Sequence, residues 1–535
     1  MPKSVKFFAM LAATVLVLFI CRWTGFLPFS GKMILSMTIF SMFIYGTLLY
    51  GEFRLAFAFG GIALLMGCNL LTVERFTQSA SLDVLVFLIG TFMVIGFLEE
   101  SQFFEHVISA IVKFVGPRPQ RLLLALMMMA AISSALVGEV TAILFMAGAM
   151  LHLTNKYRLN PVPFIIMLVF ASNNGSAMSS IGNPIGVLIA LKTGLGFTDF
   201  LLWAAPVAIV VNVVTYGICR WWYAEAFDGF AQAVKQEFAR HAKGSSRKSL
   251  VAATAIGGGA GGGGELPNNA ENLAEEETDD DESVLSAEFF NASDADTIGN
   301  LSAGSTFRLC WLILFGLVGM LVTHRLVERL LGLHEGTMMV AAALVMGSVV
   351  LLIRREKARE LVERRVDWWT LAFFMMLFAS VGTLQDTGVT EVIAKRLGSI
   401  GGTNHTLVVQ IVGWATGWLS AFLDNVLAVA TFMPVVHDIR VQAGPAPYES
   451  SIYWFMLFGG TFMGNMTVIG STANIVAVGL LEKRGHGTIG FGQWMKIGFI
   501  VSIASMLVAA GMLEVARRTL PLPSLPAPMH VVEPQ

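Results

Sequence analysis

Charged residues are scarce in this sequence, and the patterns of a metal site or of a catalytic nucleophile are missing. Asp, Glu, Lys and Arg make up 13% of the 535 residues, against about 25% in soluble proteins. The four cysteines lie in or beside apolar segments without metal-ligand spacing, so we interpret them as buried thiols. Neither Gly-x-Ser-x-Gly nor His-Glu-x-x-His occurs, and there is no basic patch for nucleic acid. The sequence therefore predicts neither an enzyme nor a nucleic-acid-binding protein.

Long apolar runs are what the chain has instead. Hydrophobic residues make up 55% of it, and the mean hydropathy is +0.69. A membrane span needs roughly 20 apolar residues. This predicts an all-α polytopic membrane protein whose first run is an uncleaved span, because further spans follow it. The eleven predicted crossings are 7–27, 33–51, 54–72, 83–99, 163–192, 199–222, 307–325, 337–353, 367–384, 453–482 and 490–514.

Two further apolar regions, 122–154 and 406–437, have a polar break in the middle. Each consists of two runs of about 15 residues, which is too short for each run to cross alone. The breaks are Gly138-Glu139 and Asp424-Asn425. We interpret both regions as re-entrant helical hairpins with a carboxylate at the tip. The alternatives are a pair of ordinary helices or one long kinked helix.

Two stretches of the sequence occur twice. SALVGEV at 134–140 returns as SAFLDNV at 420–426, an offset of 286 residues from Ala135 to Ala421. The polar, Gly-rich stretch 172–184 corresponds to 460–472, with Ile181 and Ile469 288 residues apart. Five predicted crossings separate corresponding spans, and this odd number predicts repeats of opposite orientation. Inverted repeats with broken hydrophobic segments are typical of secondary transporters that work by alternating access.

The distribution of Lys and Arg predicts the orientation. If the N-terminus lies in the cytoplasm, the basic loops 113–121, 220–248 and 354–365 all fall on the cytoplasmic side, as the positive-inside rule requires. We therefore expect a multi-pass protein of the cell inner (plasma) membrane with a cytoplasmic N-terminus.

A long polar insert separates the two repeats at 226–304. It contains a nearly all-glycine run at 257–264 and an acidic run at 275–282. Such a composition cannot bury enough apolar surface to fold, which predicts a disordered cytoplasmic loop. A regulatory role is the alternative to a passive linker.

Removing about residues 250–300 should leave membrane insertion and transport intact, because a disordered linker between two cytoplasmic helix ends contributes no packing. Uptake measured at matched expression tests this. Loss of transport would show a role for the insert, and cleavage of the loop by protease added to intact cells would overturn the orientation.

The repeats and the insert divide the chain into six parts. They are N-terminal scaffold helices (1–82), a first repeat (83–225, hairpin 122–154 and broken helix 163–192), the insert (226–304), linking scaffold helices (305–366), a second repeat (367–515, hairpin 406–437 and broken helix 453–482) and a tail (516–535).

The paired hairpin motifs and the motifs Asn-Gly-x-x-x-x-x-Ile-Gly-x-Pro (174–184) and Gly-Asn-x-Thr-x-Ile-Gly-Ser-x-Ala-Asn (464–474) resemble those of the ion transporter superfamily. This superfamily includes arsenite permeases, D-type Na⁺/H⁺ antiporters and citrate-transporter-like permeases. The resemblance covers roughly residues 30–515 without the insert. It implies a scaffold domain and a transport domain in each protomer, a homodimer in the lipid bilayer, and a site between the hairpin tips and the two broken helices.

The resemblance also implies which residues bind the ion or substrate, with Na⁺ at Asp424, Asn425, Asn465 and Asn474. Neither tip carries the Ser-Asn-Thr of sodium-coupled dicarboxylate carriers, and Gly138-Glu139 departs from the Asp or Asn often found at the first tip. The full set is Glu139, Asp424, Asn425, Asn173, Asn174, Ser176, Asn183, Asn465, Thr467, Ser471, Thr472 and Asn474.

The chemistry of these residues favours Na⁺/H⁺ antiport. Carboxylates, hydroxyls and carbonyls are ligands for Na⁺, and a carboxylate that binds either Na⁺ or H⁺ gives exchange by competition. No Lys or Arg lies in either hairpin or in 163–191, which argues against a simple anion pocket. The alternative function is an oxyanion or di/tricarboxylate permease coupled to H⁺ or Na⁺. Both readings require no cofactor other than the ion itself. In a third reading Glu139 and Asp424 are only helix caps.

Overall fold

The protein is described by a computed structural model. It describes residues 2–115, 118–236, 303–401, 404–443, 449–485 and 487–519, with residues 523 and 525. In this part of the chain all regular structure is helical, which confirms the predicted all-α class. Nine of the described helices are long and apolar enough to cross a membrane.

The predicted spans before the insert are helical in the structure, although several boundaries differ and further helices are present. The predicted scaffold region 1–82 contains α1 (Lys3–Trp23), α2 (Gly31–Leu49), α3 (Arg54–Gly67) and α4 (Val73–Ser79). The first repeat has α5 (Leu82–Glu100), α6 (Phe103–Val115), α7 (Pro119–Val137), α8 (Glu139–Lys156), α9 (Val162–Ser176), α10 (Pro184–Thr193), α11 (Phe197–Asp199), the π-helical turn η2 (Phe200–Ala204) and α12 (Ala205–Trp222).

The helices after the insert repeat much of this order. Linking helices are α15 (Ala303–Leu331), α16 (Thr337–Arg354) and α17 (Ala358–Arg365). The second repeat has α18 (Trp368–Asp386), α19 (Val389–Gly401), α20 (His405–Phe422), α21 (Asn425–Ala443), α22 (Glu449–Phe462), the 3-10 turns η5 (Met463–Asn465) and η6 (Val468–Gly470), α23 (Thr472–Lys483) and α24 (Phe491–Thr519).

The internal repeat is visible in the element bounds. Both ends of α18 lie 286 residues after those of α5, and both ends of α19 lie 286 residues after those of α6. The helices α6 and α19 were not predicted. They follow because each presents an apolar stripe: Phe103, Phe104 and Ile108 are buried in α6, and Val389 and Ala394 in α19.

Some predicted boundaries differ from the structure. The span at 54–72 becomes α3, whose 14 residues are shorter than a full crossing, and α7 is counted among the nine candidate spans. The count of eleven crossings and the re-entrant character of the hairpins therefore remain predictions. The predicted insert also begins with helix, since residues 226–236 are helical and Phe227, Phe230 and Val234 pack on one buried face. Residues 237–302 lie outside the described part.

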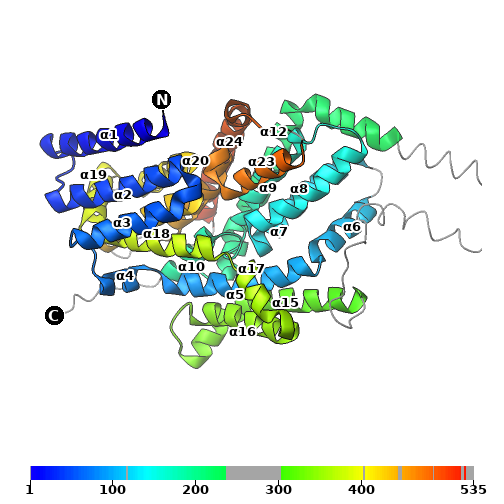
Figure 1. Cartoon of the computed structure of the whole chain (residues 1–535), viewed down its shortest axis with the longest axis horizontal. Helices are drawn as coiled ribbons and strands as arrows, with labels where there is room; N and C mark the ends of the chain where they lie inside the picture. Colours follow the sequence, from blue (N-terminus) through cyan, green and yellow to red (C-terminus); the bar gives the residue numbers. More distant parts are fainter. Residues whose placement is uncertain are drawn as a thin grey trace, which may run out of the picture.

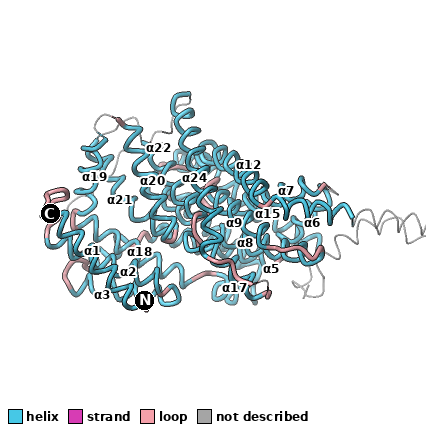
Figure 2. The backbone as a smooth tube through the Cα atoms, turned by 90° about the horizontal axis from the view of Figure 1, so that it is seen from above, coloured by secondary structure: helices cyan, strands magenta, loops and turns pink. Residues whose placement is uncertain are grey.

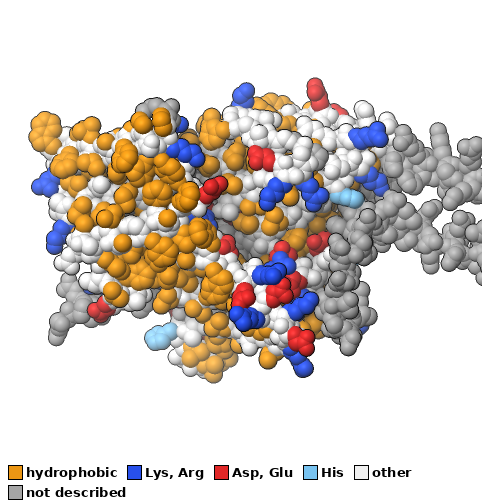
Figure 3. Space-filling view, viewed as in Figure 1, with side chains coloured by type: hydrophobic (Ala, Val, Ile, Leu, Met, Phe, Trp, Pro, Cys, Tyr) orange, Lys and Arg blue, Asp and Glu red, His pale blue; other side chains and the backbone are white. Residues whose placement is uncertain are grey.

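The helices are arranged along one long axis. Two perpendicular views place α1–α3, α18 and α19 toward one end and α6–α8 toward the other (Figures 1 and 2). The face over α1–α3 is hydrophobic, whereas charged side chains gather near α17 (Figure 3). There Arg354 and Arg365 form ion pairs with Glu100 of α5 at 2.9 and 3.2 Å.

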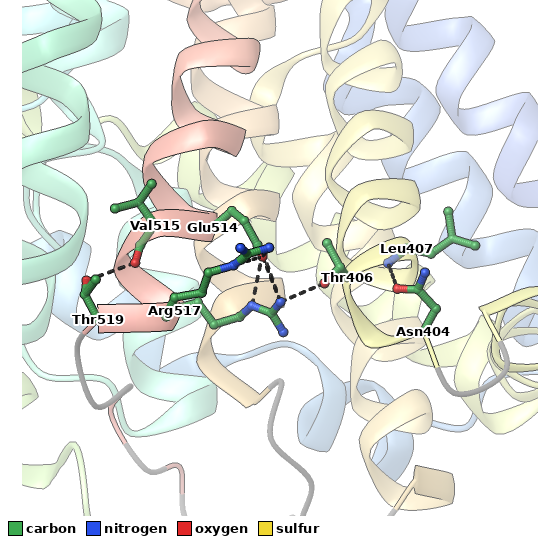
Figure 4. Close-up of polar contacts among 8 residues, drawn as sticks. Asn404, Thr406, Leu407, Glu514, Val515, Arg517 and Thr519 are labelled. Carbon is green, nitrogen blue, oxygen red and sulfur yellow. Dashed lines mark hydrogen bonds and ion pairs between the residues drawn. The ribbon is translucent and has the colours of Figure 1, made fainter.

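The ends of α20 and α24 are joined by a polar contact (Figure 4). Arg517 Nη2 of α24 donates to Thr406 Oγ1 in the first turn of α20 at 2.9 Å, and the same guanidinium contacts Glu514 at 3.0 Å. Asn404 caps α20 by accepting from Leu407 N at 3.1 Å. These contacts hold the first turn of α20, at the end of the second hairpin away from its tip, against the last turns of α24.

Candidate functional site

Both hairpin tips are sharp breaks between two helices. The chain turns from α7 to α8 at Gly138, whose φ of 92° is a conformation that other residues avoid. In the second repeat, α20 ends at Phe422 and α21 begins at Asn425, with Leu423 and Asp424 between them. Glu139 and Asn425 are therefore the first residues of α8 and α21.

Each broken helix is interrupted by a tightly folded segment. Between α9 and α10 a Cβ at Gly182 would lie 2.3 Å from Ser176 O, and between α22 and α23 a Cβ at Gly470 would lie 2.6 Å from Gly464 O. Only glycine fits these approaches. Asn183 caps α10 by accepting from Gly186 N at 2.7 Å, and Ser471 caps α23 by accepting from Ala473 N at 3.2 Å. Four helix N-termini, those of α8, α10, α21 and α23, thus belong to the site region.

The Glu139 carboxylate lies at the meeting point of both repeats. Its side chain is only 6% exposed. Asn425 Nδ2 donates to Glu139 Oε1 at 2.8 Å, and Ser471 Oγ lies 3.2 Å from the same oxygen. Ser176 lies beside the carboxyl group as well, although its proton goes to Asn173 O at 2.8 Å. The second oxygen, Oε2, is buried without a hydrogen-bond partner among the described residues.

The asparagines of the broken helices bind one another across the repeats. Asn173 Nδ2 donates to Asn465 Oδ1 and to Asn474 Oδ1, both at 2.8 Å. Asn465 Nδ2 in turn donates to Asn174 Oδ1, on the residue next to Asn173, at 2.8 Å. Asn474 Nδ2 donates to Gly464 O and Thr467 O. These amides hydrogen-bond to each other and to the backbone, and their bonds join the two repeats; we call this group the asparagine frame.

This frame is connected to Glu139 and to α12. Ser471 Oγ lies 3.1 Å from Asn173 Oδ1, and its single proton can go either there or to Glu139. At the other end Asn174 Nδ2 donates to Asn212 Oδ1 at 3.3 Å and to Thr215 Oγ1 at 3.2 Å. The sequence reasoning missed Asn212 and Thr215. A polar pair inside the apolar span 199–222 was the available signal.

Asp424 is placed differently from Glu139. It is half-buried, and both of its oxygens have protein partners. Val426 N donates to Oδ1 at 3.0 Å, and Thr472 Oγ1 donates to Oδ2 at 2.9 Å. Asp424 therefore acts as an N-cap of α21 and ties the second tip to α23.

The remaining predicted residues fall into the same neighbourhood. Asn183 Nδ2 donates to Ser176 Oγ at 2.8 Å, and Thr467 Oγ1 donates to Ala421 O at 2.5 Å. The proposed Na⁺ ligands separate into two places: Asp424 and Asn425 lie at the second tip, whereas the side chains of Asn465 and Asn474 meet at Asn173. A shared Na⁺ site of these four residues remains a prediction.

Comparison with known proteins identifies the family. The sequence profile of the citrate transporter family matches residues 53–460. The chain belongs to the citrate transporter family. This confirms the predicted ion transporter superfamily and a multi-pass membrane transporter.

Several curated proteins are similar in sequence to this chain. An uncharacterised transporter of Mycobacterium tuberculosis is 26% identical over 428 residues, covering 80% of this chain and 85% of that protein. A 46 kDa membrane protein of Mycobacterium leprae is also 26% identical, covering 80% and 84%. The human P protein is 24% identical over 461 residues, covering 81% of this chain and 53% of that protein.

A solved transporter shares the fold. The YdaH transporter of Alcanivorax borkumensis, described as having an unusual topology, superposes with a TM-score of 0.51 at 14% sequence identity. The match covers 85% of this chain and 89% of that one. At this identity the likeness concerns the fold alone.

Proposed function

We propose that this transporter is a Na⁺/H⁺ antiporter of the inner membrane in which Glu139 binds either ion. The observation that carries the proposal is Glu139 Oε2, a carboxylate oxygen buried without a protein hydrogen-bond partner among the described residues. A bare carboxylate at membrane depth is expensive. A proton or a cation removes that penalty, and only one of them can occupy the oxygen at a time.

The surroundings of Glu139 suit a small cation. Ser176 and Ser471 present hydroxyl oxygens beside the carboxylate, and hard cations prefer oxygen ligands. The site residues are tightly packed: Asn173, Asn174, Ser176, Asn465 and Ser471 are at most 1% exposed. A dehydrated ion requires less rearrangement of such packing than a larger solute does.

Competition at Glu139 becomes transport if the site opens to each side in turn. The repeated element bounds support two copies of one unit, and in this proposal the copies are inverted and rearrange by alternating access. In this proposal the N-terminus is cytoplasmic, the transport unit is one half of a homodimer, and Na⁺ and H⁺ are never bound together.

Everted membrane vesicles test the antiport. Adding Na⁺ to vesicles that hold an imposed pH gradient should collapse the gradient, because each Na⁺ displaces a proton from Glu139. A pH-sensitive dye reports the change. If Na⁺ and Li⁺ leave the gradient intact while arsenite or citrate accumulates, the antiport assignment is wrong.

A second candidate function is proton- or sodium-coupled uptake of an oxyanion or a di/tricarboxylate. Two observations favour it: four helix N-termini belong to the site region, and the family takes its description from citrate transport. Helix N-termini stabilise anions. When Glu139 is protonated, their positive ends are no longer offset by its charge, so proton binding would promote anion binding.

A further inference from the structure

Glu139 and Asn425 occupy equivalent positions of the two repeats. They lie 286 residues apart, the same interval that relates α5 to α18. Each is the first residue of its helix, and each is buried, with Asn425 2% exposed. The hydrogen bond of 2.8 Å between them therefore joins a residue to its own counterpart.

The contacts around this pair are also repeated. Ser179 Oγ donates to Ala135 O and Thr467 Oγ1 donates to Ala421 O, and these carbonyls are 286 residues apart in the sequence. The close approach of Gly182 to Ser176 matches that of Gly470 to Gly464. The backbone around the Glu139–Asn425 contact is thus similar in the two repeats.

The charge, in contrast, is present on one side only. Glu139 can ionise, whereas Asn425 supplies an amide that donates to it. Two carboxylates at this separation would share one proton. The pair is therefore built to hold one negative charge, and the repeat does not determine which member carries it.

We propose that the carboxylate of the coupling site works from either member of this pair, so that Asn425 is a latent second position for it. This rests on the proposed ion coupling by Glu139. The substitutions Glu139→Gln and Asn425→Asp exchange amide and carboxylate without a change of size. In the double variant the hydrogen bond reverses, with the amide at position 139 donating to the carboxylate at position 425. Val426 N, which donates to the Asn425 oxygen at 2.8 Å, also has Asp424 Oδ1 as an acceptor at 3.0 Å, so the second oxygen at position 425 is left available to the ion.

The test compares wild type, E139Q, E139Q/N425D and the control E139Q/N465D in Na⁺-driven proton release from everted vesicles. E139Q should fall to background. E139Q/N425D should return to within about tenfold of wild type, which corresponds to about 1.4 kcal/mol. E139Q/N465D should stay at background, because Asn465 is equally buried but points to Asn173 and Asn174.

A second readout does not depend on transport. Dicyclohexylcarbodiimide modifies protonated carboxyl groups in apolar surroundings, and mass spectrometry locates the adduct. We expect labelling at position 139 in wild type and at position 425 in E139Q/N425D, each in protein that is monodisperse by size exclusion. Folded E139Q/N425D without exchange and without label at 425 overturns the inference while wild-type exchange upholds the antiport. Labelling at 139 in wild type and at 425 in E139Q/N425D, without wild-type Na⁺/H⁺ exchange, rejects the antiport but still shows that the protonated carboxyl group can be held by either member of the pair.

Discussion

Replacing Glu139 by Gln should reduce coupled transport by about 100-fold or more, the effect of removing an interaction with a charged group worth about 3 kcal/mol. Gln keeps the size and one acceptor oxygen for Asn425 and Ser471, so the packing of the tip is preserved. It cannot bind Na⁺ through a negative charge or exchange a proton. Vesicle transport at matched membrane expression measures the loss.

Asp424→Asn and Asp386→Asn are the controls for this change. Asn is as good an N-cap as Asp, so at position 424 it still accepts from Val426 N, and we expect the rate to stay within about tenfold of wild type. Asp386 lies at the end of α18, 4.0 Å from Arg75, and its replacement should have less effect still. If Glu139→Gln transports normally while Asp424→Asn is inactive, the ion-binding carboxylate is Asp424 at the second tip and not Glu139.

Gly175→Ala should destabilise the folded protein by about 3 kcal/mol. Gly175 lies in α9 against α7, where an added Cβ would come within 2.3 Å of the Ala131 backbone. Backbone atoms cannot move aside as the end of a side chain can, so the two helices must separate, and the asparagine frame on α9 moves with them. Thermal unfolding in detergent, followed by size exclusion, measures the shift.

Gly148→Ala is the matched control for this substitution. Gly148 lies within α8, and a Cβ there would meet no atom within 4 Å. Alanine is favoured over glycine in a helix by about 1 kcal/mol, so this variant should be as stable as the wild type or more so. Equal stability of the two variants would contradict the close packing of α7 on α9.

Much of this architecture could be predicted because the sequence contains two copies of one unit. Gly138-Glu139 and Asp424-Asn425 interrupt apolar runs, and these positions are helix breaks in the structure. The Gly- and Asn-rich stretches are likewise the interruptions of the broken helices. The helices α6 and α19 were missed because their 13 residues are too short and too amphipathic for a rule based on membrane crossing.

Contacts between the repeats could not be read from spacing. Motif matching treated Asn173, Asn465 and Asn474 as possible ligands, but it cannot show that their amides satisfy one another. Nor does it distinguish Glu139, which retains an unpartnered oxygen, from Asp424, whose oxygens are both hydrogen-bonded. The direction in which half-helices face a site also depends on tertiary packing rather than on composition.

The most direct test of the central claim measures proton release from purified protein when Na⁺ is added. In weakly buffered detergent solution, competition for Glu139 predicts that Na⁺ releases protons from wild type and from Asp424→Asn in a saturable manner. Glu139→Gln should release none. Equal release from Glu139→Gln, or none from wild type while it binds Na⁺, would contradict the assignment of Glu139 as the shared ion site.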